Sequence, residues 1–401
     1  AEDAYISFRV IENVANGYGL RWNTYERVQV FTHPLWLLLH IPIYALWHNL
    51  FHASIALSVA CSLAALAVSL GSAKRPPGIG MAVFLLPLFL SKSFMDYTTS
   101  GLETPLCYLT FAGFGFVLLR LREHRHFWFY LSLSVALSLA TRLDTALIYA
   151  PTLAYLALQN LRSIRMRQVA LGALPLIAWL AFAQVYYGFV LPNTAHAKLG
   201  TGLPLALYLA QSMNYIKYLL IFDLPGFLLL ASSLAFLRHK EKIAACIALG
   251  VLLYALYVLR IGGDYMAGRF WAFPIFISVW LWFAYFPEKV RADTLFAAAC
   301  ILIAAHFSSP LLRDIHYYCK SCIELKGRVM DASRTFQANR LVVSLHPLKL
   351  RQEGGSPFCR RGKKMKTDTP QVMFYVGMHA FCAGPQLEAI DMLGLGDPLL
   401  A

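Results

Sequence analysis

The acidic pair Glu2-Asp3 is the feature of this 401-residue sequence that best fits a catalytic role. It opens a polar segment, residues 1–36, that precedes a long and largely apolar region. A carboxylate can take a proton from a hydroxyl group or stabilise positive charge that develops on a sugar ring. The pair is therefore a candidate for catalytic carboxylates.

Charged side chains recur in later connections of the chain. Taken singly, each could be an ordinary loop residue or half of a local ion pair. Taken together, cations that meet carboxylates on one face could neutralise a leaving phosphate and hold hydroxyl groups. The candidates for the phosphate are Arg142, Lys198 and Arg269. The candidates for sugar or acceptor groups are Glu103, Asp144, His196 and Asp264.

The composition sets the class of protein that must position these residues. Hydrophobic residues make up 58% and charged residues 14%, and the mean hydropathy is +0.56. These values predict an all-α polytopic membrane protein rather than a soluble one. Apolar runs long enough to cross a hydrocarbon core of ~30 Å are expected near 50–71, 79–91, 105–119, 127–141, 145–160, 169–187, 217–237, 243–260, 270–286 and 293–309.

The connections between these runs alternate in charge. One set is basic: 74–75, 120–125, 162–167, 238–242 and 289–291. The other set is nearly neutral or acidic: 92–103, 142–144, 188–202 and 260–269. Positive-inside bias places the basic set in the cytoplasm and the second set outside. Most of the net charge of +14 then belongs to inner loops and the tail, which does not favour nucleic-acid binding.

This alternation of inner and outer connections divides the chain into an outer segment 1–49, a membrane domain 50–309 and an outer domain 310–401. It requires that Pro34–Trp47 does not cross, so we expect an interfacial amphipathic helix there. An outside N-terminal segment with no apolar stretch before it also leads us to expect that a first span is missing from this sequence.

The stretch 127–159 is apolar except for Arg142 and Asp144 at its middle. A straight helix would place both charges at depth, at ~2.5–3.5 kcal/mol each on insertion scales. A hairpin avoids that, and its arms of about fifteen residues reach only ~22 Å. We therefore expect a recessed hairpin tip where Arg142 could meet a lipid phosphate.

The outer tail predicts a small α/β domain. Val372–Val376 is β-branched and aromatic and predicts a buried strand, and Leu387–Met392 could be another. The basic run Arg360–Lys366 favours a solvated loop over an anion-binding patch. The tail cysteines could form a disulfide, stay free or bind zinc; they are Cys319, Cys322, Cys359 and Cys382.

These residue types fit transfer of a sugar from a polyprenyl phosphate, which needs no nucleotide site. No Walker loop and no GxGxxG turn is present in the sequence. Two other classes remain open. A transporter or flippase of lipid-linked envelope precursors would need charged residues at mid-membrane and repeated halves. A non-catalytic envelope scaffold would use the tail for binding.

Several segments together carry a family resemblance. They read EDAYISFRVIENVANGYGLRWN, ERVQVFTHPLWLLL, SGLETPL, YYGFVLPNTAHAK, GGDYMAGRFWAFP and AIDMLGLGDPLLA, and they run in this order from residue 2 to residue 401. With them the chain resembles the GT-C glycosyltransferases, and more specifically the mycobacterial and corynebacterial terminal arabinofuranosyltransferase B family. The first and last segments are the most specific.

The resemblance implies a GT-C fold in the bacterial cytoplasmic membrane, with the active site and the C-terminal domain facing outward. It implies a donor of the decaprenyl-phosphoryl-arabinofuranose type, a cell-envelope glycan as acceptor and no cofactor besides the lipid-linked sugar. Asp3 becomes the leading catalytic carboxylate and Glu2 its partner, although family members commonly have aspartate at the first position. The resemblance adds Asn193 to the pocket residues, beside Lys198, Asp264 and Arg269.

Overall fold

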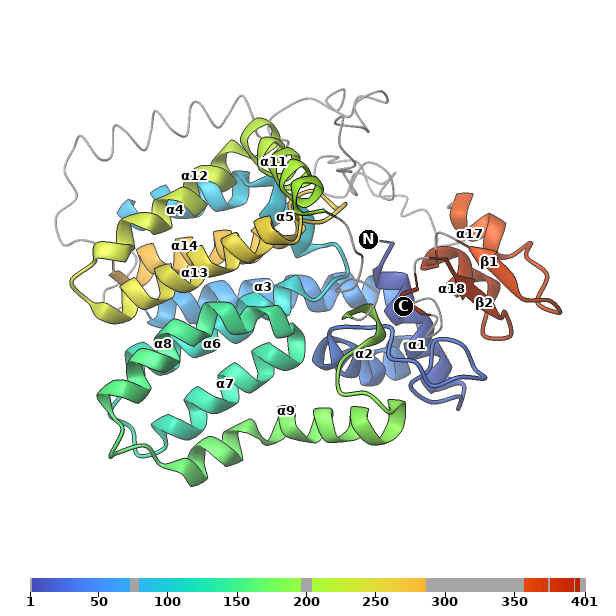
Figure 1. Ribbon diagram of the computed structural model, residues 1–401, viewed down its shortest axis with the longest axis horizontal. Coiled ribbons are helices and arrows are strands. Elements are labelled where there is room, and N and C mark those ends of the chain that lie inside the picture. Colours follow the sequence, from blue (N-terminus) through green and yellow to red (C-terminus); the bar gives the residue numbers. More distant parts are fainter. Residues whose placement is uncertain are drawn as a thin grey trace.

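A computed structural model describes residues 2–72, 79–195, 204–285, 357–373, 376–392 and 394–396. The described part is mostly helical, and its longer helices run roughly side by side (Figure 1). The helices before residue 200 are α1 Ala4–Ala15, α2 Pro34–Trp47, α3 Leu50–Ser72, α4 Ile79–Leu90, α5 Lys92–Thr98, α6 Thr104–Arg120, α7 Phe127–Thr141, α8 Ala146–Gln159 and α9 Met166–Tyr187.

The second half of the helical region begins with α11 Leu205–Phe222 and α12 Leu224–Ser232. A 3₁₀ turn, η2 Ser233–Arg238, leads from α12 to α13 Lys242–Arg260, and α14 Arg269–Tyr285 follows. These bounds match most of the apolar runs expected from the sequence. The run expected at 293–309 lies outside the described residues.

Within the described residues, α3, α9 and α13 are long and apolar enough to cross a membrane. The bent pair formed by α11 and the helical stretch Leu224–Arg238 passes the same test as one unit. The shorter apolar helices are α2, α6, α7 and α14. These apolar helices are compatible with an all-α protein embedded in a membrane.

The apolar run expected to span the membrane at 217–237 is not one continuous helix. The chain bends by 109° at Asp223, so α11 and α12 are separate helices. Asp223 caps α12 by accepting a hydrogen bond from the N–H of Gly226 at 3.1 Å, and Pro225 occupies the first turn. A cap followed by proline begins a new helix.

The hairpin expected in 127–159 is confirmed. Helices α7 and α8 are joined by the 3₁₀ turn η1 Leu143–Thr145, with Arg142 in an extended conformation at the end of α7. The Thr145 hydroxyl closes the turn with a 2.6 Å hydrogen bond to the Arg142 carbonyl. Arg142 is 5% exposed, so the tip places a guanidinium inside the protein.

Helix α2 has the bounds expected from the sequence, but it is not amphipathic. Its buried residues include Trp36 and Leu37, and its exposed residues include Leu38, Leu46 and Trp47. Both sides of the helix are therefore apolar, which suits lipid contact better than a boundary with water.

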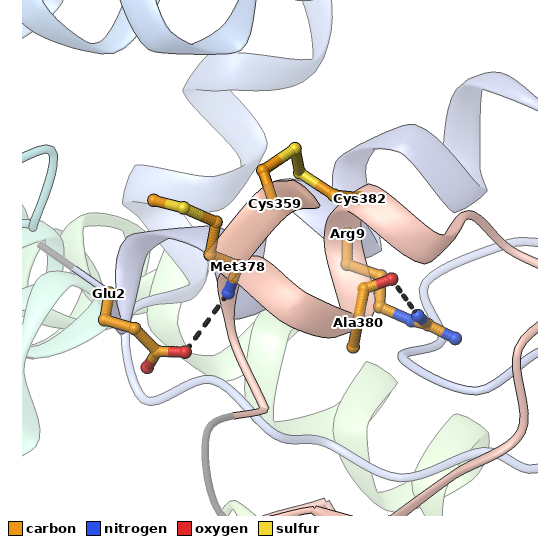
Figure 2. Close-up of a disulfide and its surroundings, with 6 residues drawn as sticks. All are labelled: Glu2, Arg9, Cys359, Met378, Ala380 and Cys382. Atoms are coloured by element: carbon orange, nitrogen blue, oxygen red, sulfur yellow. Dashed lines mark hydrogen bonds between the residues drawn. A yellow bond between two sulfur atoms is a disulfide. The ribbon is translucent and has the colours of Figure 1, made fainter. Parts of the chain in front are cut away.

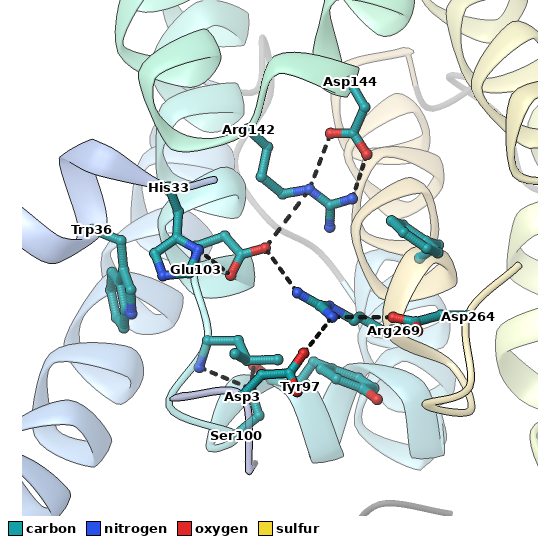
Figure 3. Close-up of polar contacts among 12 residues, drawn as sticks. Asp3, His33, Trp36, Tyr97, Ser100, Glu103, Arg142, Asp144, Asp264 and Arg269 are labelled. Carbon is teal, nitrogen blue, oxygen red and sulfur yellow. Dashed lines mark hydrogen bonds and ion pairs between the residues drawn. The ribbon is translucent and has the colours of Figure 1, made fainter. Parts of the chain in front are cut away.

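Helix α14 lies at the centre of the bundle, where its residues from Trp271 to Leu281 are all buried. A Cβ atom on Gly115 of α6 would lie 2.3 Å from the Trp280 ring, so this glycine lets α6 approach α14 closely. The packing of α14 fixes its first residue, Arg269, at the end of the bundle nearest to α1 (Figures 1 and 3).

The described part of the tail is a small α/β unit beside α1 (Figure 1). It contains α17 Pro357–Gly362, β1 Gln371–Met373, α18 Met378–Ala383 and β2 Ala389–Asp391. The two strands pair in parallel, with Val372 opposite Ile390. Strand β1 overlaps the start of the strand expected at 372–376, and β2 lies within the one expected at 387–392. Strand β1 is not wholly buried, because Val372 is 62% exposed.

Cys359 and Cys382 form a disulfide that joins α17 to α18. A zinc site that uses these two thiols is therefore wrong, whereas Cys319 and Cys322 lie outside the described residues. The basic run 360–366 begins inside α17 rather than in a loop, but its cationic side chains are exposed, as expected for a solvated segment.

Candidate functional site

Side chains from distant segments meet at one end of the bundle (Figure 3). They come from the start of α1, the start of α2, the turn before α6, the tip of the α7–α8 hairpin and the loop before α14. We call this set the polar cluster; its members are Asp3, His33, Glu103, Arg142, Asp144, Asp264 and Arg269.

Arg269 is the central cation of the polar cluster. Its Nη1 donates to Asp3 Oδ2 at 3.0 Å and to Asp264 Oδ2 at 3.1 Å, and its Nη2 lies 3.8 Å from Glu103 Oε1. The guanidinium therefore joins three carboxylates from three segments. Such charge-assisted contacts are stronger than neutral hydrogen bonds.

The loop that carries Asp264 and Arg269 is packed tightly against its neighbours. Gly263 and Gly268 both have a positive φ, of 73° and 79°. Added Cβ atoms would lie 2.5 Å from the Tyr215 ring and 2.5 Å from Ser93 Oγ, respectively. The GGDYMAGR segment thus needs glycine at these positions to bring its charged residues into the cluster.

Tyr265, in the same loop, donates its hydroxyl to Asp3 Oδ1 at 2.6 Å. The two oxygens of Asp3 are thus held by different donors, Tyr265 and Arg269. The side chain of Asp3 nevertheless keeps 23% of its surface exposed, against 8% for Asp264 and 2% for Glu103. Asp3 is therefore the most accessible of these carboxylates.

Arg142 forms the second cationic centre. Its Nε donates to Asp144 Oδ1 at 3.0 Å, and its Nη2 pairs with the other oxygen of Asp144 and donates to the Tyr254 hydroxyl at 3.0 Å. The guanidinium also lies 4.9 Å from the centre of the Phe270 ring. Among the described residues, Arg142 Nη1 has no hydrogen-bond partner, although it is buried.

Glu103 connects the two arginines. Its Oε1 lies 3.8 Å from Arg142 Nε and 3.8 Å from Arg269 Nη2, and its side chain is 2% exposed. Burial alone would raise the pKa of Glu103, but His33, Arg269 and Arg142 lower it to about 2. Because two of these neighbours are always cationic, Glu103 is ionised at neutral pH whatever the charge of His33.

His33 lies just before α2 and closes the cluster on the α1 side. Its Nδ1 is 3.3 Å from Glu103 Oε2, and its Nε2 shares a 2.8 Å hydrogen bond with the Ser7 hydroxyl. Burial lowers the pKa of His33, and the charge of Glu103 opposes this lowering without reversing it. His33 is therefore neutral at pH 7 and forms no ion pair with Glu103 at that pH.

Other residues expected at the site lie elsewhere. Glu2 turns away from the cluster toward the tail. Asn193 donates to the carbonyls of Gly394 at 2.8 Å and Leu395 at 3.2 Å, so it holds the closing segment of the chain instead of a pocket. His196 and Lys198 lie outside the described residues.

The sequence pattern alone does not single out Tyr265, Tyr254 and His33 as site residues. The two tyrosines carry no charge, and tyrosine is common in this chain, with 21 copies. The signal for His33 was its place directly before the proline that begins α2. Within the described ranges, no group of three or more His, Cys, Asp or Glu side chains is arranged to hold a metal ion.

Comparison with known proteins adds no assignment, because no family model, no curated protein and no solved structure matches this chain.

Proposed function

We propose that the protein is a membrane glycosyltransferase of the GT-C type, which moves a sugar from a polyprenyl-phosphate donor to a glycan of the cell envelope. Arabinofuranose is the donor sugar that the sequence resemblance favours. The reaction would take place on the outer face of the bacterial cytoplasmic membrane. The observation that carries the proposal is an accessible carboxylate, Asp3, held by the buried Arg269, which Glu103 links to a second buried arginine, Arg142, in a protein rich in apolar helices.

The reaction needs the parts that the polar cluster contains. The oxygen of an acceptor hydroxyl forms a bond to the anomeric carbon, and the bond from that carbon to the phosphate oxygen breaks. The electron pair of the broken bond leaves with the polyprenyl phosphate, and the hydroxyl proton passes to a carboxylate. The sugar carries positive charge in the transition state, and the phosphate gains negative charge.

In this proposal Asp3 accepts the proton, because it is the most accessible carboxylate of those that Arg269 contacts. Tyr265 and Arg269 fix its orientation. Arg142 and Arg269 are the cations for the leaving phosphate, and Arg142 Nη1 is a buried donor without a partner in the described part of the chain. Asp264 and Glu103 position the arginines and supply acceptors for sugar hydroxyls.

The test is transfer of a labelled sugar from a synthetic polyprenyl-phosphate donor in proteoliposomes. Asp3→Asn should reduce the rate by a factor of about 10² to 10⁴ at normal expression and unchanged thermal stability. Asp368→Asn is the matched control, because Asp368 is an exposed aspartate of the tail. Full activity of Asp3→Asn would remove Asp3 from the mechanism.

A transporter or flippase of lipid-linked precursors is the second candidate. The observation that favours it is the broken helix pair at Asp223, since broken helices line many transport pathways. Asp223, however, is fully buried and accepts hydrogen bonds from Ser91 Oγ and from the backbone N–H of Lys92, Ser93 and Gly226. Movement of a fluorescent lipid phosphate across the bilayer without sugar transfer would favour the transporter.

A further inference from the structure

Glu2 precedes the candidate catalytic residue, but its side chain points into the C-terminal unit (Figure 2). Its Oε1 accepts hydrogen bonds from the backbone N–H of Gly377 at 2.6 Å and of Met378 at 3.1 Å. These amides begin α18, where a helix has no internal acceptors for its N–H groups. Glu2 is 5% exposed, so its carboxylate serves this contact and is shielded from solvent.

Arg9 makes a second contact between the same two parts of the chain. Its Nη1 donates to the carbonyl of Ala380, its Nη2 to that of Leu387 at 2.6 Å, and its Nε to that of Trp22 at 2.8 Å. The side chain is 1% exposed. Helix α1 is therefore attached to α18 near its start by Glu2 and further along by Arg9 (Figure 2).

Gly377 shows how close this contact is. An added Cβ atom there would lie 2.3 Å from the Glu2 carbonyl oxygen and 2.5 Å from Glu2 Oε1. A side chain larger than hydrogen at position 377 would therefore displace Glu2. At the other end of α18, the disulfide between Cys359 and Cys382 ties the helix to α17.

We propose that Glu2 is a positioning residue: by anchoring the residues directly before α1 to α18, it fixes the direction in which Asp3 presents its carboxylate. Glu2 and Asp3 are neighbours in the chain, but their side chains bond to different parts of the protein. When Glu2 is held against Gly377 and Met378, Asp3 faces Tyr265 and Arg269. The C-terminal unit thus takes part in building the site. This inference rests on the proposed function and gives Glu2 a role other than the catalytic one expected from the sequence.

The experiment compares Glu2→Gln, Glu2→Ala and Gly377→Ala in proteoliposomes. Glutamine keeps an oxygen that can accept both N–H bonds, whereas alanine removes it, and Gly377→Ala pushes Glu2 away. We expect Glu2→Ala and Gly377→Ala to lower kcat on the order of 10- to 100-fold with little change in KM for the acceptor. Glu2→Gln should stay within about threefold of the wild type, because a positioning contact needs the acceptor oxygen and not its charge.

Amide hydrogen exchange gives a readout that does not need activity. Exchange at Gly377 and Met378 should accelerate in Glu2→Ala and stay slow in Glu2→Gln. Gly113→Ala is the matched glycine control, since a Cβ there meets no atom within 4 Å. Gly377→Ala tests the same contact from the other side if Glu2→Ala does not fold.

Three results would overturn the inference. Equal loss of activity in Glu2→Gln and Glu2→Ala would mean that the carboxylate itself takes part in the chemistry. A wild-type kcat in Glu2→Ala with accelerated exchange would mean that the contact does not position Asp3. Unchanged exchange in Glu2→Ala would refute the contact. Absence of sugar transfer by the wild type would instead refute the proposed function, even with slow exchange at Gly377.

Discussion

Arg269 Nη1 donates to Asp3 Oδ2 at 3.0 Å across 266 positions of the sequence. This bond joins the start of α1 to the start of α14, a helix that is buried along most of its length. The candidate catalytic carboxylate is thereby attached to the rigid core and not only to the surface segment that carries it. Rigid support of this kind keeps a reacting group within the narrow range of positions that catalysis requires.

Replacing Arg269 tests this support. Arg269→Ala would leave Asp3, Asp264 and Glu103 without their shared cation, and uncompensated buried charge of this kind costs about 3–5 kcal/mol. Arg269→Lys keeps the charge but not the forked geometry, so we expect a stable protein with activity reduced by at least tenfold. Thermal unfolding and sugar transfer should be measured on both variants. Arg260→Lys, an exposed arginine at the end of α13, is the control.

Tyr265→Phe removes one of the two donors that hold Asp3. A hydrogen bond to a charged group contributes about 1.5–3 kcal/mol, so the rate of transfer should fall by roughly 10- to 100-fold. The loss should appear in kcat, because the tyrosine orients the base and is not proposed to bind the donor. Tyr155→Phe, in α8, should behave as the wild type. Unchanged kcat in Tyr265→Phe would show that Arg269 alone suffices to orient Asp3.

Much of the helix arrangement follows from the sequence because hydrophobic length and loop charge are local properties. The α7–α8 hairpin could be predicted because two charges at mid-membrane are costly, which left Arg142 and Asp144 only at a turn. The bend at Asp223 could not, because it depends on the donors Ser91, Lys92 and Ser93 from a segment about 130 positions away.

The candidate site likewise has features that the local sequence predicts and features that depend on distant contacts. Asp3, Glu103, Arg142, Asp264 and Arg269 all lie in connections that the charge pattern places on one face, and the structure brings them together. The direction of a single side chain is not encoded in that pattern. Glu2 and Asp3 are adjacent and carry the same charge, so only their contacts in the structure show that Glu2 points to the tail while Asp3 points to the cluster.

Arg142 provides a test of the phosphate site. Arg142→Lys should keep the charge but lose the forked contact with Asp144 and the contact with the Tyr254 hydroxyl. We expect binding of a polyprenyl phosphate without a sugar to weaken roughly 10- to 100-fold, as for other forked contacts with phosphate. Binding can be measured in nanodiscs by titration. Arg162→Lys, in an exposed loop, is the control, and equal affinity in the two variants would exclude Arg142 from the phosphate site.

The pH dependence of stability gives a test of Glu2 that is independent of sugar transfer. Burial raises the pKa of Glu2 to about 7 from the ordinary 4.5, and the charge of Asp3 acts in the same direction. The backbone N–H groups of Gly377 and Met378 partly oppose this shift. Because the folded protein holds the proton more tightly, the contribution of Glu2 is fully present below pH 4.5 and is lost as the pH rises through about 7.

The midpoint temperature of thermal unfolding of the wild type should therefore fall as the pH rises from 4.5 to 7. Above pH 7, Glu2 should cause no further change in this temperature. Across this window Glu2 should lower the free energy of unfolding by on the order of 3 kcal/mol. Glu2→Gln mimics the protonated carboxyl group, so the variant should lose this slope and be more stable than the wild type above pH 7. Glu388→Gln, in the segment before β2, should keep the wild-type slope. A midpoint temperature that rises with pH in the same window would mean that the folded protein holds Glu2 as a charged group.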